Sequence, residues 1–352
     1  MKLKLAAAFA ALVACAPSFA QQDPGKTETA ETIRWPVPWK VGQVLTYETE
    51  NLEEERSPKK REKTRTSDRT EITITEATLE GYVQRWTASQ TRYELIEGDA
   101  EQAKLAAELI ETLADVPLLV ELDKDANYKG IRNLAEISTR VRAAMTPVLA
   151  QGVEQGVRKA KQDASDAEVK EAIEKARPHL EGLLERLSSP AFLEAAIGQV
   201  VQNFNGFVGI ELEDGASYTL DTELDNPLGE KKFPATLEFG LYASDEDPDD
   251  VFLEWKSTID PKRGADAVWE FAEKLMGTAI PKDQRKELPK EISIVDEGFL
   301  LFNRESGVIE MYENERKADL GDTHKTDRDR MRLVGGEHEH QWKEEDAAAT
   351  RE

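Results

Sequence analysis

The chain has 352 residues, of which 70 are Asp or Glu and 46 are Lys or Arg, so its formal net charge at pH 7 is −24. Such an acidic surface repels nucleic acid and anionic lipid head groups, which argues against both as partners and favours solubility. The single cysteine, Cys15, lies in the leader, so the mature chain is expected to lack disulfides, cysteine zinc sites, iron–sulfur clusters and thiol nucleophiles.

Residues 1–20 have the three parts of a bacterial secretory signal peptide. Two lysines precede an apolar stretch at residues 5–14, which is too short to span a bilayer, and Ser-Phe-Ala ends the segment as a small-x-small cleavage site. We therefore expect cleavage after Ala20, a periplasmic or secreted location and no transmembrane helix in the mature chain. An alternative stays open, because Leu-Val-Ala-Cys resembles a lipobox in which Cys15 is acylated and anchors the protein to a membrane.

The segment after the leader changes from polar to alternating. Residues 21–33 are polar and aperiodic and are expected to form a flexible arm. Trp35 and Trp39 flank two prolines, a pattern that favours a plug at the end of a core over a recognition surface. From Val41 the period is two, which predicts antiparallel strands with a turn at Leu79-Glu80-Gly81. The acidic-then-basic residues 52–68 predict a charged hairpin tip, with a docking patch as the alternative.

Residues 99–205 change to a helical period. Capping boxes beginning at Asp99, Asn133 and Ser165 each precede an apolar stripe of helical spacing. Pro178 is expected to kink or divide one helix, and Pro190 to begin the last one. The segment also contains a strand pair at 116–132. Because its stripes are narrow, this helical subdomain is expected to dock on the sheet and not to fold as a free domain.

Strand patterns return from Phe207 onwards. They cover 207–215, 217–224, 235–243 and 251–259, followed by a helix at 265–277 that Gly277 closes. Residues 291–315 predict three strands with turns at Asp296-Glu297-Gly298 and Glu305-Ser306-Gly307, and residues 330–335 a last strand. The tail 336–352 is expected to be disordered.

Two acidic stretches invite comparison with calcium sites. Asp123, Asp125 and Asn127 have the spacing of the first EF-hand ligands, but the sixth and twelfth positions hold Tyr128 and Leu134 where Gly and Glu are required. A turn between two strands is therefore predicted. The loop Asp245–Asp250 lacks a suitable twelfth residue as well; it is interpreted as a hairpin loop, with weak calcium binding as the alternative.

Sequence motifs for catalysis are missing. The four histidines are His179, His324, His338 and His340, and none belongs to an HExxH helix. The chain contains no G-x-S-x-G, P-loop or G-x-G-x-x-G. We accordingly assign no catalytic residue, no metal-binding residue and no cofactor-binding residue, and expect no cofactor.

The general layout resembles uncharacterised exported bacterial proteins filed as domains of unknown function. The resemblance is carried by the leader, the antiparallel strands, the strand–turn LDKDANYKG before a capped helix, and GFLLFNRESGVIEMY. The alternation of a large sheet with helices is also similar to the half-barrel carriers of lipoproteins. The fold class predicted is α+β: a curved antiparallel sheet from the N- and C-terminal strands, with the helical subdomain 99–205 between them, in one domain at 34–335.

Three functions remain compatible with this layout. A curved sheet with a helical lid commonly encloses an apolar cavity, which favours a non-enzymatic envelope protein that binds a lipid-like or other apolar ligand. The alternative is a protein–protein interaction module that meets another envelope protein through its acidic surface, Trp-Pro segment and charged hairpin. A third possibility is a hydrolase of unrecognised type.

Overall fold

The computed structural model describes residues 31–336, except 59, 115, 162–163, 225, 227, 229–230, 282–284 and 286–288. The expected signal peptide, with its cleavage site and Cys15, lies outside the described residues, as do most of the expected arm and tail. No described helix combines the length and the apolar composition that crossing a membrane requires.

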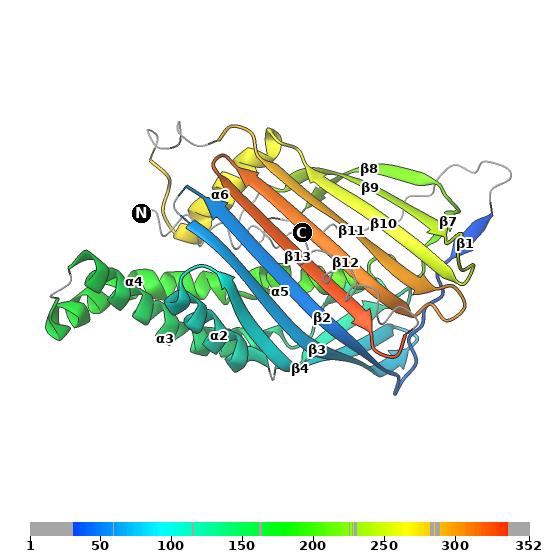
Figure 1. The fold of residues 1–352 in the computed structure, drawn as a ribbon, viewed down its shortest axis with the longest axis horizontal. Coiled ribbons are helices and arrows are strands. Elements are labelled where there is room, and N and C mark those ends of the chain that lie inside the picture. The colour runs from blue at the N-terminus through cyan, green and yellow to red at the C-terminus, as the bar shows by residue number, and fades with distance from the viewer. Residues whose placement is uncertain are drawn as a thin grey trace.

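One antiparallel sheet of 11 strands dominates the fold (Figure 1). Its order is β6-β5-β4-β3-β2-β13-β12-β11-β10-β9-β8, so the N-terminal and C-terminal strands meet where β2 pairs with β13. The short strands β6 and β8 form the two edges, and the sheet does not close into a barrel. The predicted α+β class with a curved sheet is therefore confirmed. The strands are β2 (Val44–Ser57), β3 (Lys60–Thr78), β4 (Gly81–Glu97), β5 (Leu118–Asp123), β6 (Tyr128–Ile131), β8 (Ser217–Leu224), β9 (Phe233–Ala243), β10 (Asp250–Ile259), β11 (Ser293–Asn303), β12 (Ile309–Leu320) and β13 (Thr323–Leu333).

A second sheet joins β1 (Thr32–Arg34) to β7 (Glu211–Glu213). The expectation of a flexible arm is thus wrong for its last residues, because the side chain of Ile33 is buried in the core and its backbone pairs with Leu212. Of the strand expected at 207–215, only β7 forms.

The charged segment 52–68 forms the predicted end of a hairpin. It continues β2 and β3 almost to their junction, with Glu54 directly opposite Lys63, and other acidic and basic residues form diagonal ion pairs across the hairpin. Lys60 Nζ lies 2.9 Å from Glu55 Oε2, and Arg65 Nε lies 3.2 Å from Glu50 Oε2. Opposite charges on paired strands stabilise the pairing modestly, so the same charges that suggested a tip support two long strands.

The strand predicted to turn at Asp296-Glu297-Gly298 instead runs straight through it as β11. Gly298 is needed there for space: a Cβ atom would lie 2.3 Å from Glu313 O and 2.6 Å from Trp255 Cζ2. The second expected turn, at residues 305–307, does separate β11 from β12. Likewise β13 begins at Thr323, well before the predicted strand at 330–335.

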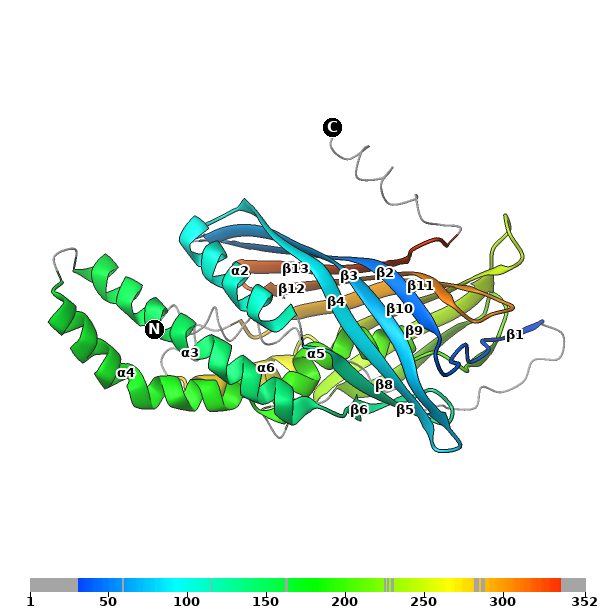
Figure 2. The ribbon, with the colours of Figure 1, turned by 90° about the horizontal axis from the view of Figure 1, so that it is seen from below.

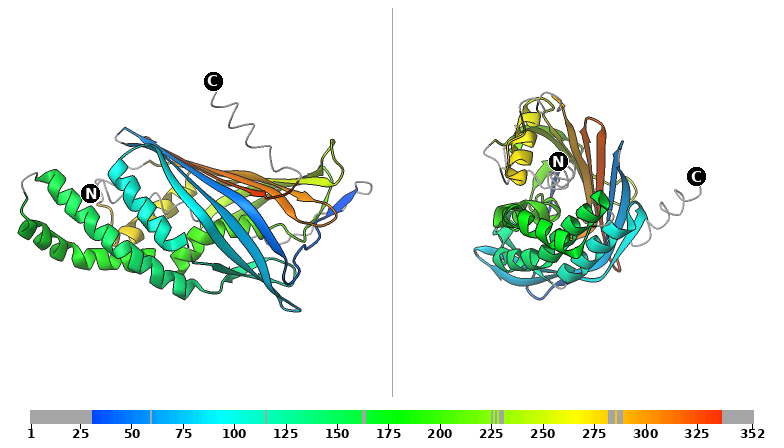
Figure 3. Two further views of the ribbon diagram at one scale, coloured as in Figure 1. Left: turned by 60° about the horizontal axis from the view of Figure 1, so that its bottom comes forward. Right: turned by 90° about the vertical axis from the view of Figure 1, so that its left-hand side faces the viewer.

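Five helices of the described chain lie on the concave side of the sheet or extend beyond it (Figure 2). Helix α2 runs beside β4, α5 lies along the concave face, and the paired helices α3 and α4 project past the sheet (Figures 1 and 3). Helix α6 packs near β9 and also contacts α4. The helices are α2 (Ala100–Ala114), α3 (Leu134–Ala160), α4 (Asp166–Leu187), α5 (Pro190–Asn205) and α6 (Arg263–Met276).

The helix ends test the capping predictions. Ser165 begins α4 with a complete capping box: Glu168 N donates to Ser165 Oγ at 3.3 Å, and Ser165 N donates to Glu168 Oε2 at 2.8 Å. Asn133 makes no side-chain cap, because Leu119 N donates to its Oδ1 at 3.0 Å and its Nδ2 donates to Pro117 O at 2.8 Å. Helix α4 is not divided at Pro178, whereas Pro190 does begin α5.

Packed side chains fill both ends of the concave face. At one end, Phe204 of α5 meets Tyr47, Trp86 and Tyr312 edge-on, with ring centroids 5.2–6.3 Å apart. Trp35 and Trp39 are buried in the same cluster, as the plug interpretation predicted. At the other end α6 contributes eight of the 17 buried residues of a second cluster around Phe271. Two rows of polar residues cross the sheet between these clusters.

Candidate functional site

The stretch around Asp123 forms the predicted turn. Asp123 Oδ1 accepts hydrogen bonds from the backbone N–H groups of Asp125 and Asn127, each at 2.9 Å, and Asp123 Oδ2 accepts from Asn127 Nδ2 at 3.0 Å. The carboxylate is therefore used to close the connection between β5 and β6. A similar bond closes the loop between β9 and β10, where Asp249 N donates to Asp247 Oδ1 at 2.9 Å.

These bonds predict that calcium has little effect on stability. A ligand stabilises a fold by RT ln(1 + [L]/Kd), so a site with a millimolar Kd contributes only about 0.4 kcal/mol at millimolar calcium. We expect the melting temperature in millimolar calcium to match that in a chelator, as measured by differential scanning fluorimetry. An increase of many degrees that Asp247→Asn abolishes would show that the acidic loop holds the ion.

The described histidines lie on different elements. His179 is exposed on α4, whereas His324 on β13 has its Nδ1 atom 2.5 Å from Asp319 Oδ1 on β12. His338 and His340 lie outside the described residues. Within the part of the chain that is described, no group of three or more His, Cys, Asp or Glu side chains is arranged to hold a metal ion.

Two polar rows cross the concave face between the two hydrophobic clusters. Each row consists of residues that are cross-strand partners in the sheet, from β10 or β12 to β3. They face inwards because strand alternation puts Asn314 and Arg316 on the same face as Tyr312, and Asn51 and Glu53 on the same face as Tyr47, and both tyrosines belong to the core. The first polar row is Ser257, Asp296, Arg316, Asp327, Glu53 and Thr64, and the second is Asn314, Asp329, Asn51 and Thr66.

The first row contains a buried ion pair. Arg316 Nη2 contacts Asp296 Oδ2, and these side chains are only 6% and 7% exposed. Gln199 of α5 donates from Nε2 to the same carboxylate oxygen at 2.9 Å. The pair therefore ties α5 to β11 and β12. Removing charges from water is costly unless they are paired and hydrogen-bonded, so this arrangement indicates a specific role in structure or function.

The side-chain amide of Asn51, in the second row, binds one carboxylate from each row. Asn51 Nδ2 donates to Asp327 Oδ1 at 2.7 Å and to Asp329 Oδ1 at 2.9 Å. Desolvation, followed by the nearby charge of Asp327, raises the pKa of Asp329 to about 7. Desolvation, followed by the charge of Glu53, raises the pKa of Asp327 as well. The two carboxyl groups thus titrate as a pair at higher pH than ordinary aspartates.

Sequence reasoning missed these rows, although a weak signal was present. Residues 327–332 read Asp-Arg-Asp-Arg-Met-Arg, and strict alternation puts both aspartates on the same face as buried Met331. The cross-strand register that adds Asn51, from the other end of the chain, has no comparable local signal.

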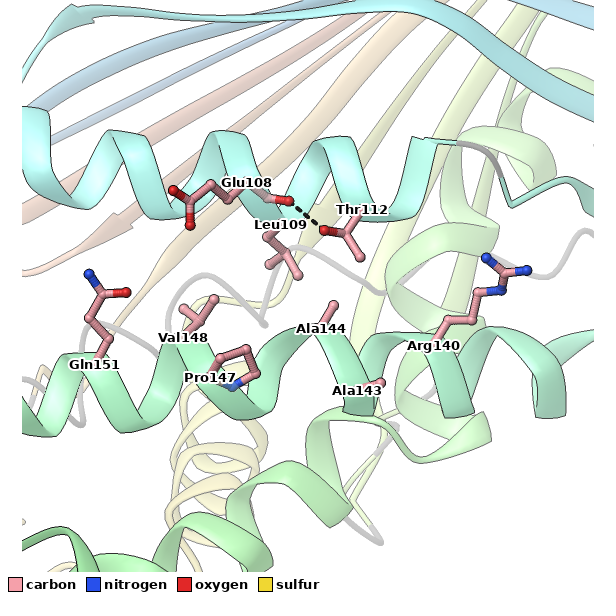
Figure 4. A pocket seen from close by; sticks show the side chains of 9 residues that line it. All are labelled: Glu108, Leu109, Thr112, Arg140, Ala143, Ala144, Pro147, Val148 and Gln151. Carbon is pink, nitrogen blue, oxygen red and sulfur yellow. Dashed lines mark hydrogen bonds between the residues drawn. The ribbon is translucent and has the colours of Figure 1, made fainter. Parts of the chain in front are cut away.

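A groove with a volume of about 560 Å³ lies between α2 and α3 (Figure 4). Its floor is apolar, with Leu109 of α2 facing Ala144, Pro147 and Val148 of α3. Polar side chains lie towards the ends, Arg140 at one and Gln151 at the other. Helical spacing places these α3 residues on one face, and the small alanines leave the space open.

Comparisons with known proteins give a fold-level likeness only. No family model matches the chain, and no curated protein matches it; both findings agree with a layout that resembles families of unknown function. Among solved structures, one that concerns lipid–protein interactions in lipovitellin is similar over 84% of this chain, with 11% identity and a TM-score of 0.37. The chain spans 25% of the length of that lipovitellin chain.

Proposed function

We propose that this protein binds an apolar, lipid-like ligand in the groove between α2 and α3, as a non-enzymatic protein exported to the cell envelope. The groove's apolar floor carries the proposal. Its volume falls within the range of about 300–1,000 Å³ that is usual for small-molecule sites. The lining of α3 is small and aliphatic, and each methylene group transferred there from water contributes about 0.8 kcal/mol.

The proposed ligand site differs from the one suggested by the sequence. A curved sheet with a helical lid suggested a cavity on the concave face, but the clusters around Phe204 and Phe271 fill both ends of that face with side chains. The α2–α3 groove lies outside those clusters. Its position on the helical subdomain also explains why 99–205 carries narrow apolar stripes that the sheet does not cover completely.

Blocking the groove should weaken ligand binding. We expect 11-(dansylamino)undecanoic acid to bind the full chain with increased fluorescence, and Ala144→Trp to weaken its affinity at least tenfold, or about 1.4 kcal/mol, because the indole fills the space beside Leu109. Titration followed by dansyl fluorescence gives both dissociation constants. Solvent extraction of the purified protein followed by mass spectrometry then identifies the natural ligand class.

The matched control is Ala135→Trp, which places the same side chain on an exposed position of α3 away from the groove. It should bind the probe as the natural sequence does, and both variants should retain the same circular dichroism spectrum. Equal affinity in Ala144→Trp and Ala135→Trp, or failure of the natural sequence to bind the probe, would contradict the groove as the ligand site.

The projecting helices favour the alternative of an interaction module. The hairpin of α3 and α4 extends past the sheet (Figure 2) and has exposed ion pairs such as Lys175–Glu171 and Arg177–Glu174 along its surface. Such a surface suits an envelope protein partner. An apolar extract free of lipid, together with co-purification of one protein that a shortened hairpin loses, would favour this function.

A further inference from the structure

We propose that the two polar rows form a buried proton-binding site, in which Asp327 and Asp329 share one proton in the folded protein and internal water connects them to Asp296. This site is separate from the α2–α3 groove and does not depend on the proposed function. It rests on the position of the two carboxyl groups, on the charges that surround them and on buried polar atoms that lack protein partners.

The first argument is the sharing of Asn51. Its Nδ2 atom donates to an oxygen of each carboxyl group, at 2.7 and 2.9 Å, so both carboxyl groups lie within hydrogen-bond distance of one amide nitrogen. Asp327 is buried and Asp329 is half-buried. Two like charges bound to one amide group, with little water around them, ionise together only at a large cost in free energy, and a shared proton removes one of the charges.

The second argument is the balance of charge around the pair. The packed strands contribute Glu53 from β2, Asp296 from β11, Arg316 and Tyr312 from β12 and Lys325 from β13. Helix α5 contributes the neutral side chains of Gln199 and Asn203. Lys325 Nζ lies 3.4 Å from Glu53 Oε2, and Arg316 is paired with Asp296. Four carboxylates thus face two cations, and one bound proton reduces this excess.

The third argument concerns hydrogen bonds. Three buried polar atoms at this site make no hydrogen bond within the described part of the chain: Ser257 Oγ, Asp296 Oδ1 and Asn314 Oδ1. Buried polar groups are almost always satisfied, and internal water is the usual partner when protein atoms are not. Ser257 is the cross-strand partner of Asp296, and Asn314 that of Asp329. Water at these positions would connect Asp296 with the carboxyl pair.

The pKa shifts give the direction of the pH effect. The pKa of Asp329 rises from its ordinary value of 3.8 to about 7 on folding, mainly through desolvation. The folded state then holds a proton that the unfolded chain has released, so the stabilisation is complete below about pH 4 and is lost as pH rises through about 7. Stability should accordingly decrease from mildly acid to mildly alkaline pH.

The test is the melting temperature of the full chain between pH 5 and pH 9. We expect the natural sequence to lose stability across neutral pH, and Asp329→Asn to lose at least half of that dependence because the amide cannot ionise. Asp245→Asn, at an exposed loop position, is the matched control and should keep the natural pH dependence. An unchanged pH dependence in Asp329→Asn would overturn the proposal.

Infrared spectroscopy tests the same site without a substitution. The natural sequence should show the carbonyl band of a protonated carboxylic acid at pH 6, and this band should disappear by pH 9. Its absence at pH 6 would overturn the shared proton even if Asp329→Asn failed to fold. A high-resolution crystal structure should show water within hydrogen-bond distance of Asp296 Oδ1 and Asn314 Oδ1; density without water there would overturn the internal connection.

Discussion

Trp35→Ala should lower the free energy of unfolding by about 4 kcal/mol, because the large-to-small change removes a fully buried aromatic side chain and leaves a cavity. The indole ring stacks on Phe302 with centroids 3.8 Å apart and planes 5° from parallel. Its Nε1 donates to Gly307 O at 2.9 Å, so the substitution also leaves a carbonyl without this donor. Urea denaturation followed by circular dichroism measures the difference.

Two further variants separate the contributions in this prediction. Trp35→Phe keeps an aromatic ring on Phe302 but removes the donor, and should cost about 1–3 kcal/mol through the unsatisfied carbonyl and the smaller ring. Leu79→Ala changes a side chain that is 93% exposed and should change stability by less than about 0.5 kcal/mol. If Trp35→Ala cost no more than Leu79→Ala, the N-terminal segment would not be part of the core.

Local patterns were sufficient for much of the fold. Alternation predicted the long strands on both sides of the helical segment, and the Ser165 capping box and the Pro190 start were both correct. The Asp123 turn was predictable because its hydrogen bonds join residues only two to four apart. In these cases the interactions that determine the local structure lie within one turn or one strand, so a short sequence pattern is enough to predict them.

Errors arose where distant residues decide the structure. Gly298 was predicted to be a turn residue, yet it lies within a strand where Trp255 and the β12 backbone leave no space for a Cβ atom. Asn133 was predicted to cap a helix, yet its side-chain amide makes hydrogen bonds with the backbone of Pro117 and Leu119 at the start of β5.

The candidate sites were the least predictable part. The polar rows require the pairing of β2 with β13, which brings Asn51 to Asp327 and Asp329 across almost the whole chain. The groove depends on the distance between α2 and α3, which periodicity does not give. Both sites depend on contacts between residues that are far apart in the sequence. The catalytic and metal-binding motifs that the sequence excludes depend instead on the local spacing of residues.

Arg316→Met should lower the free energy of unfolding by about 3–5 kcal/mol, because it leaves Asp296 in the core without its cation. The exposed pair of Lys317 and Glu297 is a matched control, since it joins the same two strands at the neighbouring register on the other face. Lys317 Nζ lies 3.2 Å from Glu297 Oε1, with side chains 51% and 42% exposed. Lys317→Met should therefore cost less than about 1 kcal/mol.

Combining Arg316→Met with Asp296→Leu should restore most of the lost stability, because neither member of the ion pair then remains buried without the other and apolar groups fill similar space. The free energy of unfolding should not recover completely, because Gln199 Nε2 loses the carboxylate that accepts its hydrogen bond. A buried unsatisfied donor costs about 1–3 kcal/mol. Urea denaturation of both single variants and the double variant gives the coupling energy. Additive costs would show that Arg316 and Asp296 do not depend on each other, and the ion pair would then have no role in holding α5 on the sheet.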